Sequence, residues 1–166
     1  MSKRRSFYCR NRPPAGFTMV ELMIVVAIAG ILSAMAFGGF QWVTQSQRVK
    51  ASVFDLFASL TVARSEAIKR NGDVTITPVV ANTWQSGWTI TSGGVTLKTQ
   101  AALSGVVVTG GGGTLPATVV YSRSGRLSGA TMSSFQVDAS ATTTDHVRCV
   151  KIELSGLPRT SKGVCP

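Results

Sequence analysis

An apolar run at residues 17–37 is the feature that most constrains this 166-residue chain. As an α-helix it would be roughly 31 Å long, at about 1.5 Å per residue, which is enough to cross the hydrocarbon core of a bilayer. One acidic residue, Glu21, lies inside the run. A carboxylate in a membrane helix costs roughly 3 kcal/mol or more. Glu21 is therefore expected to have a charged partner or a function.

The residues before the run carry positive charge and no negative charge. By the positive-inside rule the N-terminus is predicted to be cytoplasmic, with the rest of the chain beyond the inner membrane. The whole chain has a formal net charge of +10. Five of the 17 basic residues and none of the seven acidic ones lie in residues 1–16, which leaves a net charge of +5 for the remainder. That balance suits a polyanionic partner or a solvated basic surface equally well.

The junction between these two segments reads PPAGFTMVELMIVV at residues 13–26. It resembles the N-terminus of type IV pilins and type II secretion pseudopilins. The resemblance implies that a prepilin peptidase cuts between Gly16 and Phe17 and methylates the new amino group of Phe17. It also implies that Glu21 pairs with the amino terminus of a neighbouring subunit during assembly. Residues 1–16 would then be a leader peptide.

Two other interpretations of the N-terminus stand beside this one. The first is an ordinary secretory signal peptide with a small-x-small site at Ala34-Met35-Ala36, whose cleavage would release a soluble domain. The second is a plain membrane anchor. Glu21 disfavours the signal peptide, because the apolar region of such peptides normally excludes charge.

The helix is predicted to continue beyond the apolar run. Val49, Val53, Leu56, Leu60, Ala63 and Ala67 recur at spacings of three and four, which indicates an amphipathic helix. Asn71-Gly72 is a suitable stop signal. We therefore expect one helix over residues 17–70, with a transmembrane and assembly segment at 17–40 and an amphipathic continuation at 41–71.

Residues 72–166 are predicted to form a β-rich head. Short runs with β-branched and aromatic residues alternate with Gly, Ser, Thr and Asn. The candidate strands are residues 74–77, 88–91, 95–98, 106–108, 118–121, 134–137 and 147–152. Gly93-Gly94 and Ser124-Gly125 are expected to be turns, and residues 110–113 a flexible loop. The predicted fold class is α+β, a long N-terminal helix packed on a mostly antiparallel β-rich head.

A second resemblance covers the middle of the chain. Residues 60–71, followed by Val74, and the segment WQSGWTI at residues 84–90 are similar to the FimT/GspH family of minor pilins and pseudopilins. The resemblance implies the same helix-plus-β-head fold and association with other pilin or pseudopilin subunits. It implies a FimT-like minor pilin that assembles into or primes a type IV pilus. The alternative is a GspH-like minor pseudopilin of a type II secretion system.

Three cysteines are present, and Cys9 belongs to the predicted leader. Cys149 and Cys165 remain, on the side of the membrane expected to be oxidising, and they predict a disulfide. Closing a loop of about 15 residues would stabilise the head by on the order of 3 kcal/mol. Two cysteines and one distant histidine do not form a zinc ligand set, so no metal site is expected.

The C-terminal third has an excess of basic residues. FimT-like minor pilins are associated with DNA uptake through basic residues near this end, typically in a Gly-Arg-x-Arg pattern. This chain has Gly-Leu-Pro-Arg at residues 156–159, so one of the two arginines is absent. Double-stranded DNA is a candidate partner, or this segment is a solvated loop closed by the disulfide. The candidate DNA-binding residues are Arg148, Lys151, Arg159 and Lys162.

Neither an enzyme nor a cofactor is predicted. His146 is the only histidine, no nucleophile motif accompanies it, and it is expected at the surface or a strand edge. Residues 110–113 lack the Lys-Ser/Thr of a phosphate-binding loop. Trp84 and Trp88 are predicted to lie in the core. Arg64 and Glu66 are expected on a solvated helix face, with pairs from Glu66 to Lys69 or Arg70.

Overall fold

The computed structural model describes residues 16–113, 115–129, 132–139 and 146–166, without the side chains of residues 35–39. The chain divides into two units between Phe40 and Gln41. The elements follow one another as α1 (Met19–Arg70), β1 (Val74–Val80), β2 (Thr83–Ser92), β3 (Val95–Gln100), β4 (Val106–Gly110), the 3-10 turn η1 (Gly111–Gly113), β5 (Val119–Tyr121), β6 (Ser133–Ala139), β7 (Arg148–Ile152) and β8 (Pro158–Lys162).

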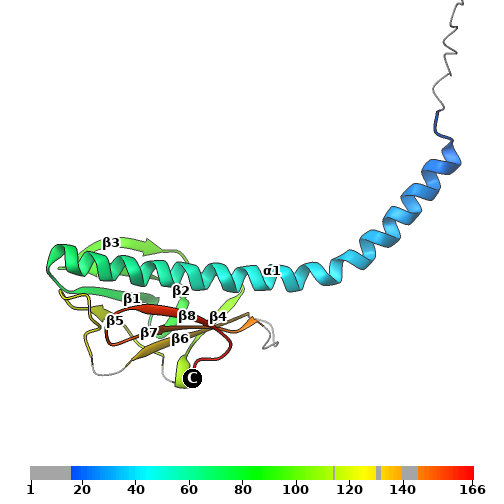
Figure 1. The fold of residues 1–166 in the computed structure, drawn as a ribbon. Coiled ribbons are helices and arrows are strands. Elements are labelled where there is room, and N and C mark those ends of the chain that lie inside the picture. The colour runs from blue at the N-terminus through cyan, green and yellow to red at the C-terminus, as the bar shows by residue number, and fades with distance from the viewer. Residues whose placement is uncertain (1–15, 114, 130–131, 140–145) are drawn as a thin grey trace, which may run out of the picture. The chain divides into compact units, whose positions relative to one another are not determined.

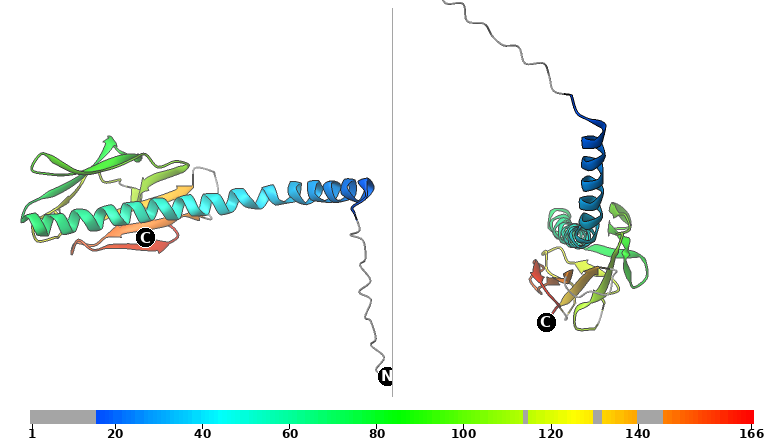
Figure 2. Two further views of the ribbon diagram at one scale, coloured as in Figure 1. Left: turned by 90° about the horizontal axis from the view of Figure 1, so that it is seen from above. Right: turned by 90° about the vertical axis from the view of Figure 1, so that its right-hand side faces the viewer.

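The strands form two four-stranded sheets, of order β3-β2-β1-β5 and β4-β6-β7-β8. Every strand pair in both sheets is antiparallel. Within the unit Gln41–Pro166, the second half of α1 runs along the strands (Figure 1). Seen from above, green strands of the first sheet lie on one side of this helix and red β8 lies on the other (Figure 2). The predicted α+β class is confirmed.

One core joins the helix to both sheets. The helical stripe predicted from the sequence is buried, and its residues are 0–6% exposed. They are Val49, Val53, Leu56, Leu60, Ala63 and Ala67. Trp84 and Trp88 of β2 are also buried, as predicted, and Phe135 and Val150 contribute from the other sheet. All buried apolar residues that the structure describes lie between Val49 and Ile152. The unit Gln41–Pro166 therefore holds a complete core of its own.

Residues close to each end of α1 determine where the helix begins and ends. Thr18 precedes the helix, and its Oγ1 accepts a hydrogen bond of 3.2 Å from the backbone N–H of Glu21, as an N-cap residue does. At the other end Asn71 has a positive φ of 50°. The N–H of Gly72 donates to the carbonyl of Ala67, and the N–H of Asn71 donates to that of Ile68. This is the Schellman arrangement, which satisfies two terminal carbonyls and stops the helix.

The structure corrects the prediction for residues 110–113. Gly110 is the last residue of β4, and Gly111–Gly113 form the turn η1 rather than a flexible loop. The reason is close packing: a Cβ on Gly111 would meet Cβ of Cys165 and Oγ of Ser134. Glycine is needed there because the C-terminal segment passes directly against its backbone.

Strand β2 begins five residues earlier than predicted and contains Gly87. Gly87 has a positive φ of 89°, and a Cβ there would collide with the carbonyl oxygen of Gln100 on β3. A glycine lets β2 pass this point while remaining paired with its neighbour. Gln85 and Ser86, which lie outside the predicted strand, are therefore part of β2.

Tyr121 yields a prediction about alkaline pH. Its side chain is fully buried, and its hydroxyl has no hydrogen-bond partner among the described residues. Burial raises the pKa of Tyr121 well above its ordinary value, although the nearby Arg64 charge opposes the shift. Because the pKa of Tyr121 is raised in the folded state, the contribution of its protonated hydroxyl to stability is fully present below about pH 10. It is lost as the pH rises further, since the unfolded state then releases the phenol proton while the folded state keeps it.

We expect the folded segment 41–166 to show no phenolate absorbance at the pH where free tyrosine titrates. The other tyrosine, Tyr8, lies outside that segment, so the signal belongs to Tyr121 alone. A spectrophotometric titration of folded and urea-unfolded protein measures it. Titration at about pH 10 in both states would contradict the burial of this side chain.

Candidate functional site

The predicted cleavage site lies in an open segment. Gly16 and Phe17 precede α1, and the Phe17 side chain is 81% exposed. A Cβ built on Gly16 meets nothing within 4 Å. This chain's own structure therefore imposes no requirement for glycine at position 16.

Glu21 lies in the first turn of α1 and is exposed. Its backbone N–H is bonded to the Thr18 hydroxyl, and the Thr-x-x-Glu spacing is that of a capping box. A negative charge in the first turn also interacts favourably with the helix dipole. Glu21 thus favours the start of the helix as well as being a candidate for pairing with an amino terminus.

The first part of α1 presents apolar side chains in every direction. Its large apolar side chains at positions 19–32 are all more than half exposed. Consecutive residues cannot all lie on one helix face, since neighbours are about 100° apart. The exposed side chains are Met19, Val20, Leu22, Met23, Ile24, Val25, Val26, Ile28, Ile31 and Leu32.

Within the part of the chain that the structure describes, no helix combines the length and apolarity that crossing a bilayer requires. The predicted span ends at residues 35–37, whose side chains lie outside the described ones.

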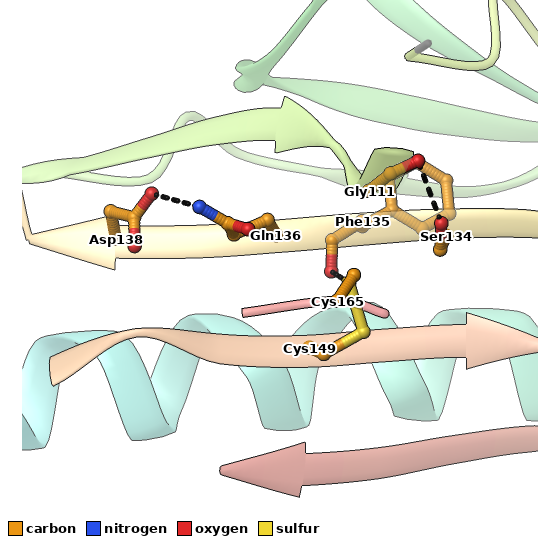
Figure 3. Close-up of a disulfide and its surroundings, with 7 residues drawn as sticks. All are labelled: Gly111, Ser134, Phe135, Gln136, Asp138, Cys149 and Cys165. Carbon is orange, nitrogen blue, oxygen red and sulfur yellow. Dashed lines mark hydrogen bonds between the residues drawn. A yellow bond between two sulfur atoms is a disulfide. The ribbon is translucent and has the colours of Figure 1, made fainter. Parts of the chain in front are cut away.

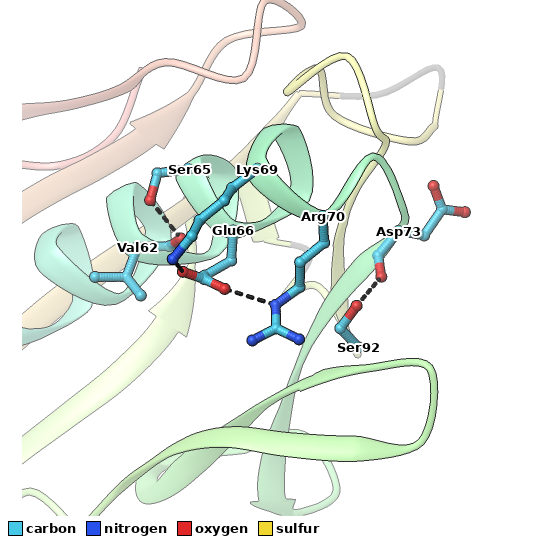
Figure 4. Close-up of polar contacts among 7 residues, drawn as sticks. All are labelled: Val62, Ser65, Glu66, Lys69, Arg70, Asp73 and Ser92. Carbon is cyan, nitrogen blue, oxygen red and sulfur yellow. Dashed lines mark hydrogen bonds and ion pairs between the residues drawn. The ribbon is translucent and has the colours of Figure 1, made fainter.

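The charged residues at the end of α1 have structural roles (Figure 4). Glu66 pairs with Lys69 at 3.6 Å and with Arg70 at 2.6 Å, as predicted. The hydrogen bond from Arg70, assisted by the Lys69 charge, lowers the pKa of Glu66. Arg64, expected on a solvated face, instead donates from Nε to the carbonyl oxygen of Gly125 at 2.9 Å. It ties the helix to the turn after β5.

A disulfide joins Cys149 of β7 to Cys165 (Figure 3). Cys149 is buried, and the Sγ of Cys165 lies 3.4 Å from the carbonyl oxygen of Phe135 on β6. Ser134, next to Phe135, donates to the carbonyl of Gly111 at 3.1 Å. The disulfide therefore holds the C-terminal segment against the middle of the second sheet.

The segment between the two cysteines is not the loop that the sequence suggested. Pro158–Lys162 forms strand β8, the edge strand of its sheet, paired along its whole length with β7. Its sequence is polar and lacks an apolar alternation, so it carries little strand signal. Pairing with β7 and the nearby disulfide select the extended conformation, and Pro158 is tolerated because it begins an edge strand.

The four candidate DNA-binding residues lie on two adjacent strands but form two pairs. Arg148 is opposite Lys162, and Lys151 is opposite Arg159. Residues directly opposite each other share a face, and successive residues alternate between faces. The two pairs therefore lie on opposite faces of the β7–β8 ladder.

The surroundings of the two pairs differ. The Nε of Arg159 pairs with a carboxylate oxygen of Glu153 at 2.6 Å. That contact partly neutralises the Lys151 and Arg159 pair. Among the described residues, no salt bridge involves Arg148 or Lys162.

His146 was expected at the surface or a strand edge, and the structure corrects this. Its side chain is 7% exposed and lies two residues before β7. The imidazole contacts the ring of Trp42 edge-on, with 4.9 Å between ring centroids. The sequence offered no signal for this contact, because the two residues are about a hundred positions apart. Among the described residues no group of three or more potential metal ligands occurs.

Comparisons with known proteins agree with this geometry. The family described as "Type II transport protein GspH" matches residues 53–156, and the prokaryotic N-terminal methylation motif matches residues 11–37. Two fimbrial proteins of Pseudomonas aeruginosa are each 44% identical over 54 residues, which is 32% of this chain. The chain thus spans about a third (35%) of the length of these relatives.

Two crystal structures of the type IV minor pilin FimU from Pseudomonas aeruginosa PAO1 share the fold. Their TM-scores are 0.60 and 0.58, at 18% and 20% sequence identity. The matches cover 72% and 68% of this chain, and 97% and 91% of the FimU chains. With the GspH match extending over more than half of its length, this chain belongs to the GspH family and is a type IV minor pilin or pseudopilin.

Proposed function

We propose that this protein is a FimT-like minor pilin that is anchored in the inner membrane and assembles into, or primes, a type IV pilus. The observation that carries the proposal is the apolar surface around the first part of α1. Its side chains at positions 19–32 are exposed on all sides of the helix. Such a surface is stable only in lipid or among other apolar helices. A pilus subunit would meet both environments in turn: lipid while it is held in the membrane, and other apolar helices after it enters the fibre.

Cleavage by a prepilin peptidase between Gly16 and Phe17 would link these two states. It would remove the basic leader at residues 1–16 and create a free amino group on Phe17, which the peptidase would methylate. The head would lie in the periplasm until assembly. Nothing in this scheme requires catalysis by the chain itself, and its family is one of structural subunits.

Glu21 is proposed to select the neighbouring subunit. In an apolar helix bundle an unpaired carboxylate is costly, and an opposite charge offsets much of that cost. The ammonium group of Phe17 on an adjacent subunit supplies that charge only after cleavage. Assembly of uncleaved precursor is thereby disfavoured.

Replacing Glu21 with glutamine tests this role. Glutamine keeps the volume of the side chain and its suitability for the capping box, but it removes the charge. We expect normal cleavage and at least a tenfold drop in incorporation, because a buried ammonium group left without its partner costs roughly 3–5 kcal/mol. Immunoblots of sheared surface fibres and of membranes measure the ratio of assembled to membrane-held subunit.

Thr18→Ala is the matched control, since it weakens the helix cap by about 1 kcal/mol and leaves the charge of Glu21 in place. It should assemble nearly as well as the unmodified protein. Normal incorporation of Glu21→Gln would show that charge pairing is not what selects the neighbour.

The alternative is a GspH-like minor pseudopilin of a type II secretion system, which the name of the matching family favours. The two functions place the subunit differently. A pilus subunit is recovered in fibres sheared from the cell surface, whereas a pseudopilin stays with the envelope and its deletion blocks protein secretion. Fractionation combined with a secretion assay separates them.

DNA binding is a second candidate function of the head. The supporting observation is that four basic residues lie on the neighbouring strands β7 and β8 at the edge of the second sheet, one pair on each face. The test is the affinity of oxidised residues 41–166 for duplex DNA across a salt series, with an Arg159→Ala, Lys162→Ala double variant. Binding that weakens steeply with salt and is lost in the double variant would support phosphate contacts. Absence of binding at low salt would leave the assembly role alone.

A further inference from the structure

A concave pocket lies between the second half of α1 and the ends of β7 and β8. Its volume is about 280 Å³. This is slightly below the usual range of roughly 300–1,000 Å³ for small-molecule sites. All of its lining residues belong to the unit Gln41–Pro166. We call it the basic pocket, and its lining includes Trp42, Ser46, Lys50, His146, Arg148 and Lys162.

Three basic residues line the basic pocket. Lys50 comes from α1, while Arg148 and Lys162 come from neighbouring strands. Among the residues that the structure describes, no carboxylate lines the pocket and no salt bridge involves any of the three. Arg148 and Lys162 are also direct cross-strand partners, an arrangement that is destabilising for like charges.

The other like-charged pair on the same two strands shows how this repulsion can be relieved within the chain. Lys151 and Arg159 are also opposite each other, and there Glu153 pairs with Arg159. The third charged residue that lines the basic pocket is Lys50, a cation and not a carboxylate. A bound anion would supply the missing negative charge.

His146 is the second, independent observation. Its side chain is 93% buried, it lines the pocket, and its Nε2 has no hydrogen-bond partner among the described residues. A buried polar atom without a partner costs free energy and is uncommon. The ring of Trp42 lies edge-on against the imidazole and also lines the pocket.

We propose that the basic pocket binds a single phosphate group, supplied by an anionic phospholipid headgroup or by a free phosphate ion. Arginine and lysine are the side chains that phosphate oxygens prefer, and Ser46 adds a hydroxyl donor. Duplex DNA is disfavoured as the ligand, because its phosphates project from a convex surface and the pocket is a recess.

The lipid headgroup is the source that the position of Trp42 favours. Trp42 is 57% exposed and follows the apolar run by five residues. Tryptophan is enriched at the level of lipid headgroups. This part of the inference rests on the membrane anchoring proposed above, whereas binding of a free phosphate ion does not.

The single histidine allows a direct test with the full chain. Protein labelled only at histidine and purified without a histidine tag gives one imidazole signal, that of His146, in an NMR spectrum. The chain is placed in nanodiscs of phosphatidylcholine, and inorganic phosphate is added at constant ionic strength. A second sample has nanodiscs with an equal part of phosphatidylglycerol, and a third receives duplex DNA.

We expect a saturable shift of the His146 signal with phosphatidylglycerol, with phosphate, or with both. The Lys50→Gln, Lys162→Gln double variant should weaken binding at least about tenfold, which is the effect of losing one charge-assisted hydrogen bond. Both lysines are exposed, so the fold is expected to persist. Lys98→Gln is the control, because it makes the same kind of substitution and removes one positive charge from exposed β3 of the other sheet.

The outcomes are distinct. A shift with phosphatidylglycerol alone identifies a lipid headgroup, and a shift with phosphate alone identifies the free ion. The proposal is overturned if neither shifts the signal, if only DNA does, or if the double variant binds like the unmodified protein. Glu21 takes no part in the pocket, so failure here leaves the assembly role standing.

Discussion

We expect Gly16→Leu to leave the chain at full length in the membrane and absent from any fibre. A peptidase at the membrane face must approach the backbone of the residue before the cut, and a leucine side chain blocks that approach. The substitution is not expected to disturb the fold, because a Cβ on Gly16 meets nothing within 4 Å and the φ of Gly16 is not positive. The fold itself is therefore expected to be unaffected, and the loss of cleavage should be essentially complete.

Intact mass and N-terminal sequencing of the membrane-bound protein measure this result. Gly30→Ala is a suitable control, because position 30 is equally open in the isolated chain and lies away from the cut. It should be processed normally. Full processing of Gly16→Leu would remove the support for a prepilin peptidase site and restore the signal peptide or plain anchor as the explanation of the apolar run.

Trp84→Ala is expected to produce the largest loss of stability in the head. Trp84 is fully buried on β2, and its ring lies edge-on to Phe135 on β6 with 4.7 Å between centroids. It therefore connects the two sheets. Its indole N–H also donates to the carbonyl of Pro116 at 2.8 Å. Truncation removes both contacts and leaves a cavity, at a cost of about 3–5 kcal/mol.

That cost is a large part of the roughly 5–15 kcal/mol by which a typical domain is stable. Urea unfolding of oxidised residues 41–166, followed by circular dichroism, measures it. Trp42→Ala is the control, since this 57% exposed ring contacts only one other ring among the described residues. It should cost about 1 kcal/mol. Equal losses for the two variants would contradict Trp84 as the centre of the core.

Periodicity made the helix predictable. Six apolar residues at spacings of three and four were expected on one face, and all six are buried. The stop at Asn71-Gly72 was equally local, because the Schellman hydrogen bonds involve only the last turn and the two residues after it. The strand pattern located most of the β-rich head for the same reason. In each case the residues that decide the structure are close together in the chain.

The local sequence pattern did not predict the structure of β8 or of residues 111–113. Pro158–Lys162 is polar and becomes a strand through its ladder with β7. Gly111–Gly113 becomes an ordered turn because Cys165 and Ser134 pack directly against Gly111. Both decisions depend on residues that are distant in sequence.

The sequence by itself determined the N-terminal features: the apolar run, Glu21 within it, and the Gly16–Phe17 junction, whose chemistry depends on adjacent residues. Only the tertiary structure decided how the basic residues are grouped. It separated Arg148 and Lys162 from Lys151 and Arg159, because alternate residues of a strand point to opposite faces. It also brought Lys50, Trp42 and His146 to one pocket, since antiparallel pairing and helix packing join segments a hundred residues apart.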